Sequence, residues 1–465
     1  MKNKKAAISI FISIIIALSI TNPAVAATEE KIKTKIKLNV EADEYENWEG
    51  VSNVSQFIGK DGEFWFAYNG KDKVTVVNTV DGRVGQKTEL PKQHSLFGAV
   101  CSDNDGNYYV VTGEENTGDD AGKETVFISK YDSNGNLITT VGDNGASSLA
   151  SYYDVSGFAT KIPFRHGNCD VAVNGGYLAV DYARTMYNNH QSNSVWLIAT
   201  ESMNTVSPPE FDYFSESASL NRVSGIYNSH SFGQRAVNYN DGFLFMSEGD
   251  AYNRAFTLHQ WNIKDSYIKQ DDIFHFWIKP GSSEDMKIVN NNYAHMGDIA
   301  VLSDGTAAFA ATSVKSLDSN ADNESEQLFI QVFSPDGDLG AESGYRTSGM
   351  RKGTSGINGG EEVTDYGVKW LTDDGKYIYK HPQMVSMGDK FVILYEKYAK
   401  KTLKYKGVYY MVLDSTGNIV QESRKFKKAA KLNPCETPVY TKGSIYWVAN
   451  KGTKKGKVFI HKLTV

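Results

Sequence analysis

Cysteine, proline and long apolar runs are scarce in this chain, and each scarcity excludes a class of protein. Three cysteines in 465 residues (Cys101, Cys169 and Cys435) allow at most one internal disulfide and form no zinc motif, which excludes a disulfide scaffold. Ten prolines exclude a collagen-like chain. No run of 18 apolar residues follows residue 26, so the sequence predicts no membrane span there.

The first 26 residues differ from the rest. Three lysines precede an apolar run, Ala6–Ile20, and Ala24-Val25-Ala26 then forms an A-x-A site. This order is typical of a secretory signal peptide, with a short membrane anchor as the alternative. We therefore expect a signal peptide at 1–26 and a secreted, extracellular mature chain at 27–465, with association to a cell wall left open.

The composition favours a globular protein made of strands. Hydrophobic residues are 40% and charged residues 22%, which is ordinary for a chain that buries a core. Glycine (41 residues), tyrosine (27) and phenylalanine (22) are abundant. Many glycines and aromatics with little proline favour short strands joined by tight turns.

A hairpin unit recurs along the chain about every 63 residues. In each copy an alternating segment leads to a turn containing glycine, and a strongly hydrophobic strand follows. An Asn-Gly or Asp-Gly turn between such segments is a strong hairpin signal, because both turn residues adopt positive φ. The seven marker glycines are Gly62, Gly106, Gly176, Gly242, Gly305, Gly388 and Gly443.

A second turn appears later in several units, so each unit is expected to supply four antiparallel strands. The four examples are Thr79–Gly82, Asp132–Asn136, Ser334–Gly337 and Asp414–Asn418. Seven four-stranded units predict an all-β fold, a seven-bladed β-propeller spanning residues 27–465 as one domain. The last unit offers only three strands, and the alternating segment Lys31–Val40 is expected to complete it and join the two ends of the chain.

This periodicity resembles the broad class of secreted bacterial β-propellers over nearly the whole mature chain. The sequence has no Gly-His…Trp-Asp pairing of WD40 repeats, no Ser-x-Asp-x-Gly-x-x-Trp box of sialidase-type propellers and no kelch double glycine. The resemblance therefore implies an architecture and leaves the activity open.

Candidate functional residues lie where the units begin. Five histidines precede the first strands of five units: His94, His166, His230, His295 and His381. The first strand of each blade lines the central channel of a propeller, so we expect these residues to converge on one mouth of the channel. Aligning the Ala-Val steps of the first strands puts Asp170, Gln234 and Asp298 at equivalent places.

The loops after the second strands should open on the same face, here called the channel-mouth face. They carry acids, tyrosines and arginines in units three and four. We expect ligand contacts from nine residues: His166, Asp170, Arg184, His190, His230, Arg235, Arg254, His295 and Asp298. The favoured function is a binding or scaffolding protein for a carbohydrate or a surface protein. The competing interpretation is structural, because such side chains also tie neighbouring blades together.

An enzymatic alternative rests on resemblance. Propeller-type polysaccharide lyases use His, Tyr and Arg on this face, which implies parts for His166, His190 and Arg254 and for three tyrosines, Tyr182, Tyr187 and Tyr252. A lyase or hydrolase acting on an anionic polysaccharide is therefore the second hypothesis, with Arg neutralising a uronate and His or Tyr moving a proton. No lyase motif is matched residue by residue.

The sequence gives no strong cofactor signal. Histidines around one channel suit a transition metal, but no local H-x-H or H-x-x-x-H spacing occurs. Asp103–Asn107 resembles part of a calcium loop without its closing glutamate and is interpreted as a hairpin turn. We expect no cofactor, no nucleic acid partner and a monomer.

Positive charge gathers in the last part of the chain. Residues 396–465 hold 16 Lys and Arg against four Asp and Glu, whereas the whole chain has a net charge of −6. The basic runs are Lys397–Lys406, Arg424–Lys431 and Lys451–Lys457. They suit either an anionic cell-wall polymer or acidic polysaccharide, or protection of exposed strand edges.

Overall fold

The computed structural model describes most of the chain, and structural statements below refer to these residues. They are 27–38, 52–145, 150–151, 159–165, 167–208, 223–224, 226, 228, 230–249, 255–275, 294–315, 325–333, 351–352, 364–365, 368–428, 430–449 and 456–465. The predicted signal peptide at 1–26 lies outside them, as do Val40 and the turn Ser334–Gly337.

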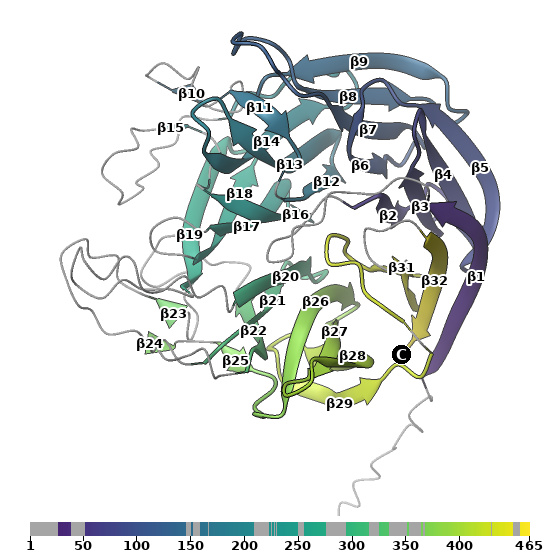
Figure 1. Cartoon of the computed structure of the whole chain (residues 1–465), viewed down its shortest axis with the longest axis vertical. Coiled ribbons are helices and arrows are strands. Elements are labelled where there is room, and N and C mark those ends of the chain that lie inside the picture. Colours follow the sequence, from purple (N-terminus) through teal and green to yellow (C-terminus); the bar gives the residue numbers. More distant parts are fainter. Residues whose placement is uncertain are drawn as a thin grey trace, which may run out of the picture.

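Seven sheets of four or more strands, built mainly of antiparallel pairs, are arranged radially around one axis, as Figure 1 shows, which confirms the predicted seven-bladed propeller. Blade one contains β2 (Val54–Ile58), β3 (Phe64–Asn69), β4 (Lys73–Val80) and β5 (Arg83–Pro91). Blade two contains β6 (Leu96–Ser102), β7 (Tyr108–Gly113), β8 (Val126–Tyr131) and β9 (Leu137–Asp143).

Blades three and four depart from the simple four-stranded plan. Blade three has β12 (Cys169–Asn174), β13 (Tyr177–Met186) and β14 (Gln191–Ala199), and its outer position is reduced to an Ile198–Thr205 bridge. β11 (Thr160–Pro163) adds to β13, and β10 (Ala150–Ser151) pairs with β15 (Val223–Ser224). Blade four has β16 (Ser231–Tyr239), β17 (Gly242–Gly249), β18 (Ala255–Asn262) and β19 (Tyr267–His275), extended by β23 (Arg351–Lys352) and β24 (Thr364–Asp365).

The remaining blades follow the four-stranded plan. Blade five contains β20 (Ala294–Val301), β21 (Ala307–Ser313), β22 (Gln327–Phe333) and β25 (Lys369–Trp370). Blade six contains β26 (Tyr377–Met387), β27 (Lys390–Ala399), β28 (Lys404–Asp414) and β29 (Ile419–Lys425). Blade seven contains β30 (Val439–Thr441), β31 (Ser444–Ala449), β32 (Gly456–Thr464) and β1 (Thr28–Leu38).

The turn glycines are where the sequence pattern predicts them. Gly106 (φ 86°) and Gly305 (φ 87°) adopt the left-handed backbone in the turns between the first and second strands of their blades. At Gly242 the same turn places the positive φ on Asn240 (47°) instead. An asparagine tolerates this conformation better than most residues, so the turn keeps its geometry.

The ring is closed by the N-terminal strand, as the sequence predicts. β1 pairs antiparallel with β32, so that Thr28 faces Thr464 and Leu38 faces Gly456. Ile36 and Leu38 point into the core between blades seven and one, whereas Lys33, Lys35 and Lys37 face solvent. The alternation of charged and aliphatic residues therefore fixes which face of the closing strand is buried.

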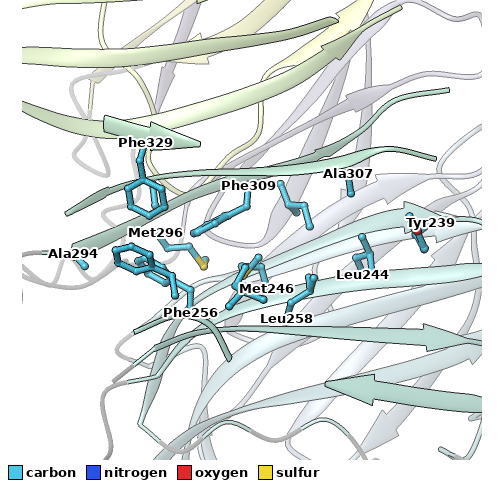
Figure 2. Close-up of a cluster of buried hydrophobic side chains, with 14 residues drawn as sticks. Tyr239, Leu244, Met246, Phe256, Leu258, Ala294, Met296, Ala307, Phe309 and Phe329 are labelled. Carbon is cyan, nitrogen blue, oxygen red and sulfur yellow. The ribbon is translucent and has the colours of Figure 1, made fainter. Parts of the chain in front are cut away.

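The core consists of apolar layers between neighbouring blades. In the layer between blades four and five, Phe274 stacks on Phe329 with ring centroids 4.4 Å apart. In the same layer Phe256 meets Phe309 edge-on at 5.1 Å (Figure 2). Offset and edge-on aromatic pairs stabilise such a layer beyond the area they bury. Each blade is thus held mainly by its two neighbours.

A buried histidine under the closing strand predicts sensitivity to acid. His461 of β32 stacks on Trp447, is 1% exposed, and its Nδ1 has no hydrogen-bond partner within the described ranges. Burial, and to a lesser degree the Lys31 charge, lower its pKa to about 3. Between pH 6.5, the ordinary pKa of a histidine, and pH 3, His461 therefore binds a proton in the unfolded chain but not in the folded one. The free energy of unfolding consequently falls as the pH drops from about 6.5 towards 3.

His461→Phe should remove this part of the acid sensitivity while keeping the stacking. Between pH 7 and 4.5 we expect the variant to lose about 2–3 kcal/mol less unfolding free energy than the native chain, measured by urea denaturation at each pH. Equal losses in the two proteins would show that His461 is protonated in the folded state.

Candidate functional site

The channel-mouth face carries three pairs of a histidine and a glutamate, in blades two, five and six. Each histidine lies shortly before an inner strand or in its first half: His94 precedes β6, His295 is in β20 and His381 is in β26. Each glutamate comes from the second strand or the loop that follows it, and this end of the blade lies beside the start of the inner strand.

In blade two, His94 lies flat on Phe127 and faces a carboxylate. The two rings are 3.5 Å apart between centroids and nearly parallel, and His94 Nδ1 lies 3.4 Å from Glu114 Oε2. Lys123 Nζ lies 2.9 Å from the other oxygen of Glu114. The Lys123 ammonium, with a smaller effect of His94, lowers the pKa of Glu114. The pair is therefore an ionised carboxylate that orients a half-buried imidazole.

The blade-five pair is closer and more enclosed. His295 Nδ1 lies 3.0 Å from Glu326 Oε2, which also accepts a hydrogen bond from the Thr312 hydroxyl at 3.3 Å. Burial alone would lower the pKa of His295, but the charges of Glu326 and Glu248 outweigh burial and the repulsion of Lys380, so the pKa is raised. His295 is consequently more cationic near neutral pH than an ordinary histidine.

In blade six, a buried glutamate collects several donors. Glu396 is 1% exposed and accepts hydrogen bonds from Tyr398, from Lys431 Nζ at 3.0 Å and from the Leu432 amide at 2.9 Å. His381 Nδ1 lies 3.6 Å away, too far for a hydrogen bond. Burial would raise the pKa of Glu396, but His381, Lys431 and Tyr398 together hold it at about 2.

His381 also has an unusual backbone. Its φ is 51°, and it lies in the bulge of β26 where the register with β27 shifts. A left-handed conformation costs a residue with a β-carbon about 1–2 kcal/mol, so the surrounding structure must stabilise it. Strained residues of this kind cluster at functional sites.

All three pairs share one orientation. The Nδ1 atom of each ring faces the glutamate, which leaves the opposite nitrogen, Nε2, as the atom that can meet a ligand. The sequence predicts the histidines but not their partners, because Glu114, Glu326 and Glu396 lie at three different separations along the chain from their histidines. Only strand pairing brings them together.

Two other predicted residues lie together between blades three and four. The rings of His190 and His230 meet edge-on with centroids 5.2 Å apart. His230 also has a positive φ of 53°, and its amide donates to the carbonyl of Gln191 at 2.7 Å. His190 is exposed in the loop after β13. This position supports the expectation that loops of two adjacent blades meet on one face.

Asp298 and Arg235 lie deeper, between the inner strands. Arg235 Nε lies 2.6 Å from Asp298 Oδ1, and both side chains are almost fully buried, at 1% and 0% exposure. Asp298 also accepts hydrogen bonds from the Thr437 hydroxyl at 2.7 Å and from the Met384 amide at 3.1 Å. It therefore links blades four, five, six and seven.

Asp170 has a similar linking position in blade three. Its Oδ2 accepts a hydrogen bond from the Ala236 amide of blade four at 2.9 Å. Burial raises the pKa of Asp170 to about 6, although the charge of Arg235 opposes the shift. Burial and the Asp170 charge also raise the pKa of Glu436, whose carboxylate accepts from the Gln56 amide at 3.0 Å. Asp170, Asp298 and Glu436 thus act as ties between blades, and ligand contact by the first two stays a prediction.

The connection from blade six to blade seven crosses the channel. In this segment, residues 430–437, the carbonyl of Pro434 accepts a hydrogen bond from Arg235 of blade four at 2.5 Å. Asn433 donates to Ser52 of blade one at 2.7 Å, and Gln383 of blade six donates to the carbonyl of Glu436 at 2.8 Å. The segment, here called the central plug, ties blades on opposite sides of the ring, and the periodic sequence pattern gave no sign of it.

Arg184 belongs to the interior of blade three. It is 0% exposed, and its guanidinium donates to the Gly145 carbonyl at 2.8 Å and to the Ser192 hydroxyl at 3.0 Å. Tyr182 is equally buried, and burial raises its pKa to about 12. Tyr187 lies nearer the surface and donates to the Asp120 carbonyl at 3.0 Å. The predicted residues His166, Arg254 and Tyr252 lie outside the described residues.

No metal-binding arrangement of three or more His, Cys, Asp and Glu side chains occurs among the residues that the structure describes. The calcium-like segment forms a turn: Asp103 accepts hydrogen bonds from the amide of Asn107 at 2.8 Å and from the hydroxyl of Tyr109 at 2.9 Å. Over the same ranges, no helix has the length and apolar character needed to cross a bilayer.

No protein-family model matches the sequence, and no curated protein matches it. Among solved structures, an α-L-arabinofuranosidase of Fusarium graminearum aligns at 9% identity over 93% of this chain and 96% of its own, with a TM-score of 0.41. The Trypanosoma rangeli sialidase aligns at 9% over 82% and 59%, with a TM-score of 0.39. A thermostable family-43 glycoside hydrolase aligns at 11% over 64% and 88%, with a TM-score of 0.33. At these identities the likeness to the three structures is one of fold alone.

Proposed function

We propose that this protein is a secreted, extracellular carbohydrate-binding propeller whose channel-mouth face holds an acidic sugar. The carrying observation is that Glu114 and Glu326 orient two imidazoles, His94 and His295, through Nδ1, while His381 lies 3.6 Å from Glu396 on the same face. Although burial opposes it, the Glu326 charge raises the pKa of His295, and a cationic Nε2–H is a donor suited to a carboxylate.

The raised pKa of His295 gives this proposal a pH signature. Because the protonated ring binds the acidic sugar, affinity is expected to be higher at pH 6 than at pH 8 and to fall as pH rises through the His295 pKa. The charged groups facing this ring are Glu326, Glu248 and Lys380. Burial would raise the pKa of Glu326, but the charge of His295 lowers it, so Glu326 stays ionised between pH 6 and pH 8.

The test is calorimetric titration with trigalacturonate at pH 6 and pH 8. We expect His295→Gln to weaken binding about tenfold at pH 6 and to flatten the pH dependence, as expected for the loss of one charge-assisted hydrogen bond. The matched control is Lys390→Gln, at the β26–β27 turn on the opposite face, which should leave affinity unchanged. Absence of binding by the native protein, or equal loss in both variants, would refute the proposal.

The second candidate is the polysaccharide lyase or hydrolase. A specific cluster supports it: Tyr398 donates to Glu396 and receives a hydrogen bond from Lys431 Nζ at 2.8 Å. Burial and the Glu396 charge raise the pKa of Tyr398, so it suits proton donation better than proton abstraction. Incubation with polygalacturonate while following the absorbance of unsaturated product tests this candidate, and turnover lost in His190→Ala would favour it.

A further inference from the structure

The perimeter of blades six and seven carries two groups of exposed basic side chains in one row, with Glu29 and Glu30 between them. Figure 1 shows the arrowhead of β29 meeting the start of β1, and β1 continues along the edge of the ring towards β5. The Lys427 amide donates a hydrogen bond to the Glu29 carboxylate, which joins the two strands head to tail. The row, here called the basic belt, consists of Lys33, Lys35, Lys37, Arg424, Lys425 and Lys427.

The structure creates this belt from two distant parts of the sequence. The C-terminal basic run supplies its first half and the closing strand supplies the second, so the N-terminal lysines extend the positive region around the ring. The belt runs from Arg424 to Lys427 and, past the contact with Glu29, on to Lys37, which gives a path of roughly 40 Å at the usual rise of a strand.

The charge of the belt is not neutralised by the protein. None of its six side chains forms an ion pair within the described part of the chain, whereas lysines elsewhere on the surface do: Lys73 lies 2.5 Å from Glu89, and Lys442 lies 2.5 Å from Glu63. Uncompensated like charges along one edge repel each other and attract a polyanion.

Edge protection does not account for the belt. The outer strand of blade two, β9, is also an exposed edge, and it has the sequence LITTVGD without a single lysine, with Leu137 and Ile138 about half exposed. If the lysines served only to prevent edge-to-edge pairing, β9 would need them more than β1. The basic residues follow one part of the ring rather than its edges in general.

We propose that the basic belt is a second binding surface that holds a linear acidic polysaccharide along the perimeter of the ring. Its length suits a polymer rather than a small anion. None of the 18 residues of β1 and β29 is aromatic, so the belt lacks the stacking platform with which proteins bind single-stranded nucleic acid. The choice of a polysaccharide rests on the proposed function.

The test compares polygalacturonate binding by the native chain, a belt variant and a charge-matched control, using biolayer interferometry at several salt concentrations. In the belt variant (Lys33→Glu, Lys35→Glu and Lys37→Glu) we expect affinity to fall at least tenfold and its salt dependence to weaken. The control reverses the charge of three exposed lysines of blade one, Lys60, Lys71 and Lys87, and should stay within about twofold of the native chain. Thermal unfolding checks that both variants fold.

Two further probes separate the alternatives. Trigalacturonate is too short for the belt, so its binding should be unchanged in the belt variant and should depend on His295. If the polymer binds through the belt but trigalacturonate does not bind at all, the belt proposal stands and the proposed function fails. Equal loss of polymer binding in the belt variant and the control would overturn the belt. Equally tight binding of polyphosphate or single-stranded DNA would also overturn it, by showing general attraction to polyanions.

Discussion

Arg235→Ala is expected to lower the free energy of unfolding by about 3–5 kcal/mol. The substitution leaves the Asp298 carboxylate, which is 0% exposed, without its cation, and removes the hydrogen bond to the Pro434 carbonyl that holds the central plug. A buried charge that loses its partner destabilises a protein far more than the pair had stabilised it. Urea denaturation followed by tryptophan fluorescence measures the loss.

The matched control is Arg165→Ala. Arg165 is about half exposed and lies 3.9 Å from Glu115, a distance at which a surface ion pair contributes little. We expect a change within about 0.5 kcal/mol. A double variant, Arg235→Met with Asp298→Asn, should recover part of the loss because no charge remains buried. A loss below about 1 kcal/mol in Arg235→Ala would mean that water reaches the carboxylate.

Ile36→Asp in the closing strand is expected to lower the free energy of unfolding by a similar amount. Ile36 is 4% exposed and packs in the layer between blades seven and one, so the new carboxylate would be buried without a partner. Loss of an aliphatic side chain alone costs about 2–5 kcal/mol, and the buried charge adds to it. The same denaturation experiment at neutral pH measures the effect.

Lys35→Asp is the control on the same strand, because its side chain faces solvent, and it should change stability by less than about 1 kcal/mol. If Ile36→Asp fails to fold, Ile36→Val still tests the packing with an expected cost of about 1 kcal/mol. Equal effects of the two aspartates would show that β1 is not docked on β32 in solution.

The architecture can be predicted because short segments of the sequence specify it. A glycine turn between two alternating segments specifies a hairpin without reference to the rest of the chain, and repetition of that unit specifies the ring. The alternation in β1 likewise reveals which residues close the ring. Blade three departs from the pattern because its outer strand contributes only the Ile198–Thr205 bridge, which no turn signal announces.

The site was only partly predictable, because its contacts are non-local. The first-strand histidines recur at one place in the unit and could be found, but their glutamate partners come from neighbouring strands at irregular separations. Position in the unit alone predicts Arg235 and Asp298 as ligand contacts, and nothing in the sequence indicates that the two side chains face each other. The central plug is an inter-blade connection, and connections have no periodicity to detect.

The pairing of Thr28 with Thr464 has a consequence for biosynthesis. The ribosome makes β1 before the other strands of the ring and β32 after them, so the closing strand stays without its partner until β32 has been translated. A product truncated before Gly456 would leave Ile36 and Leu38 exposed to water. The unpaired edge of β1 would then be accessible to proteases or to pairing with other chains. Closure of the ring therefore requires that synthesis has passed β32.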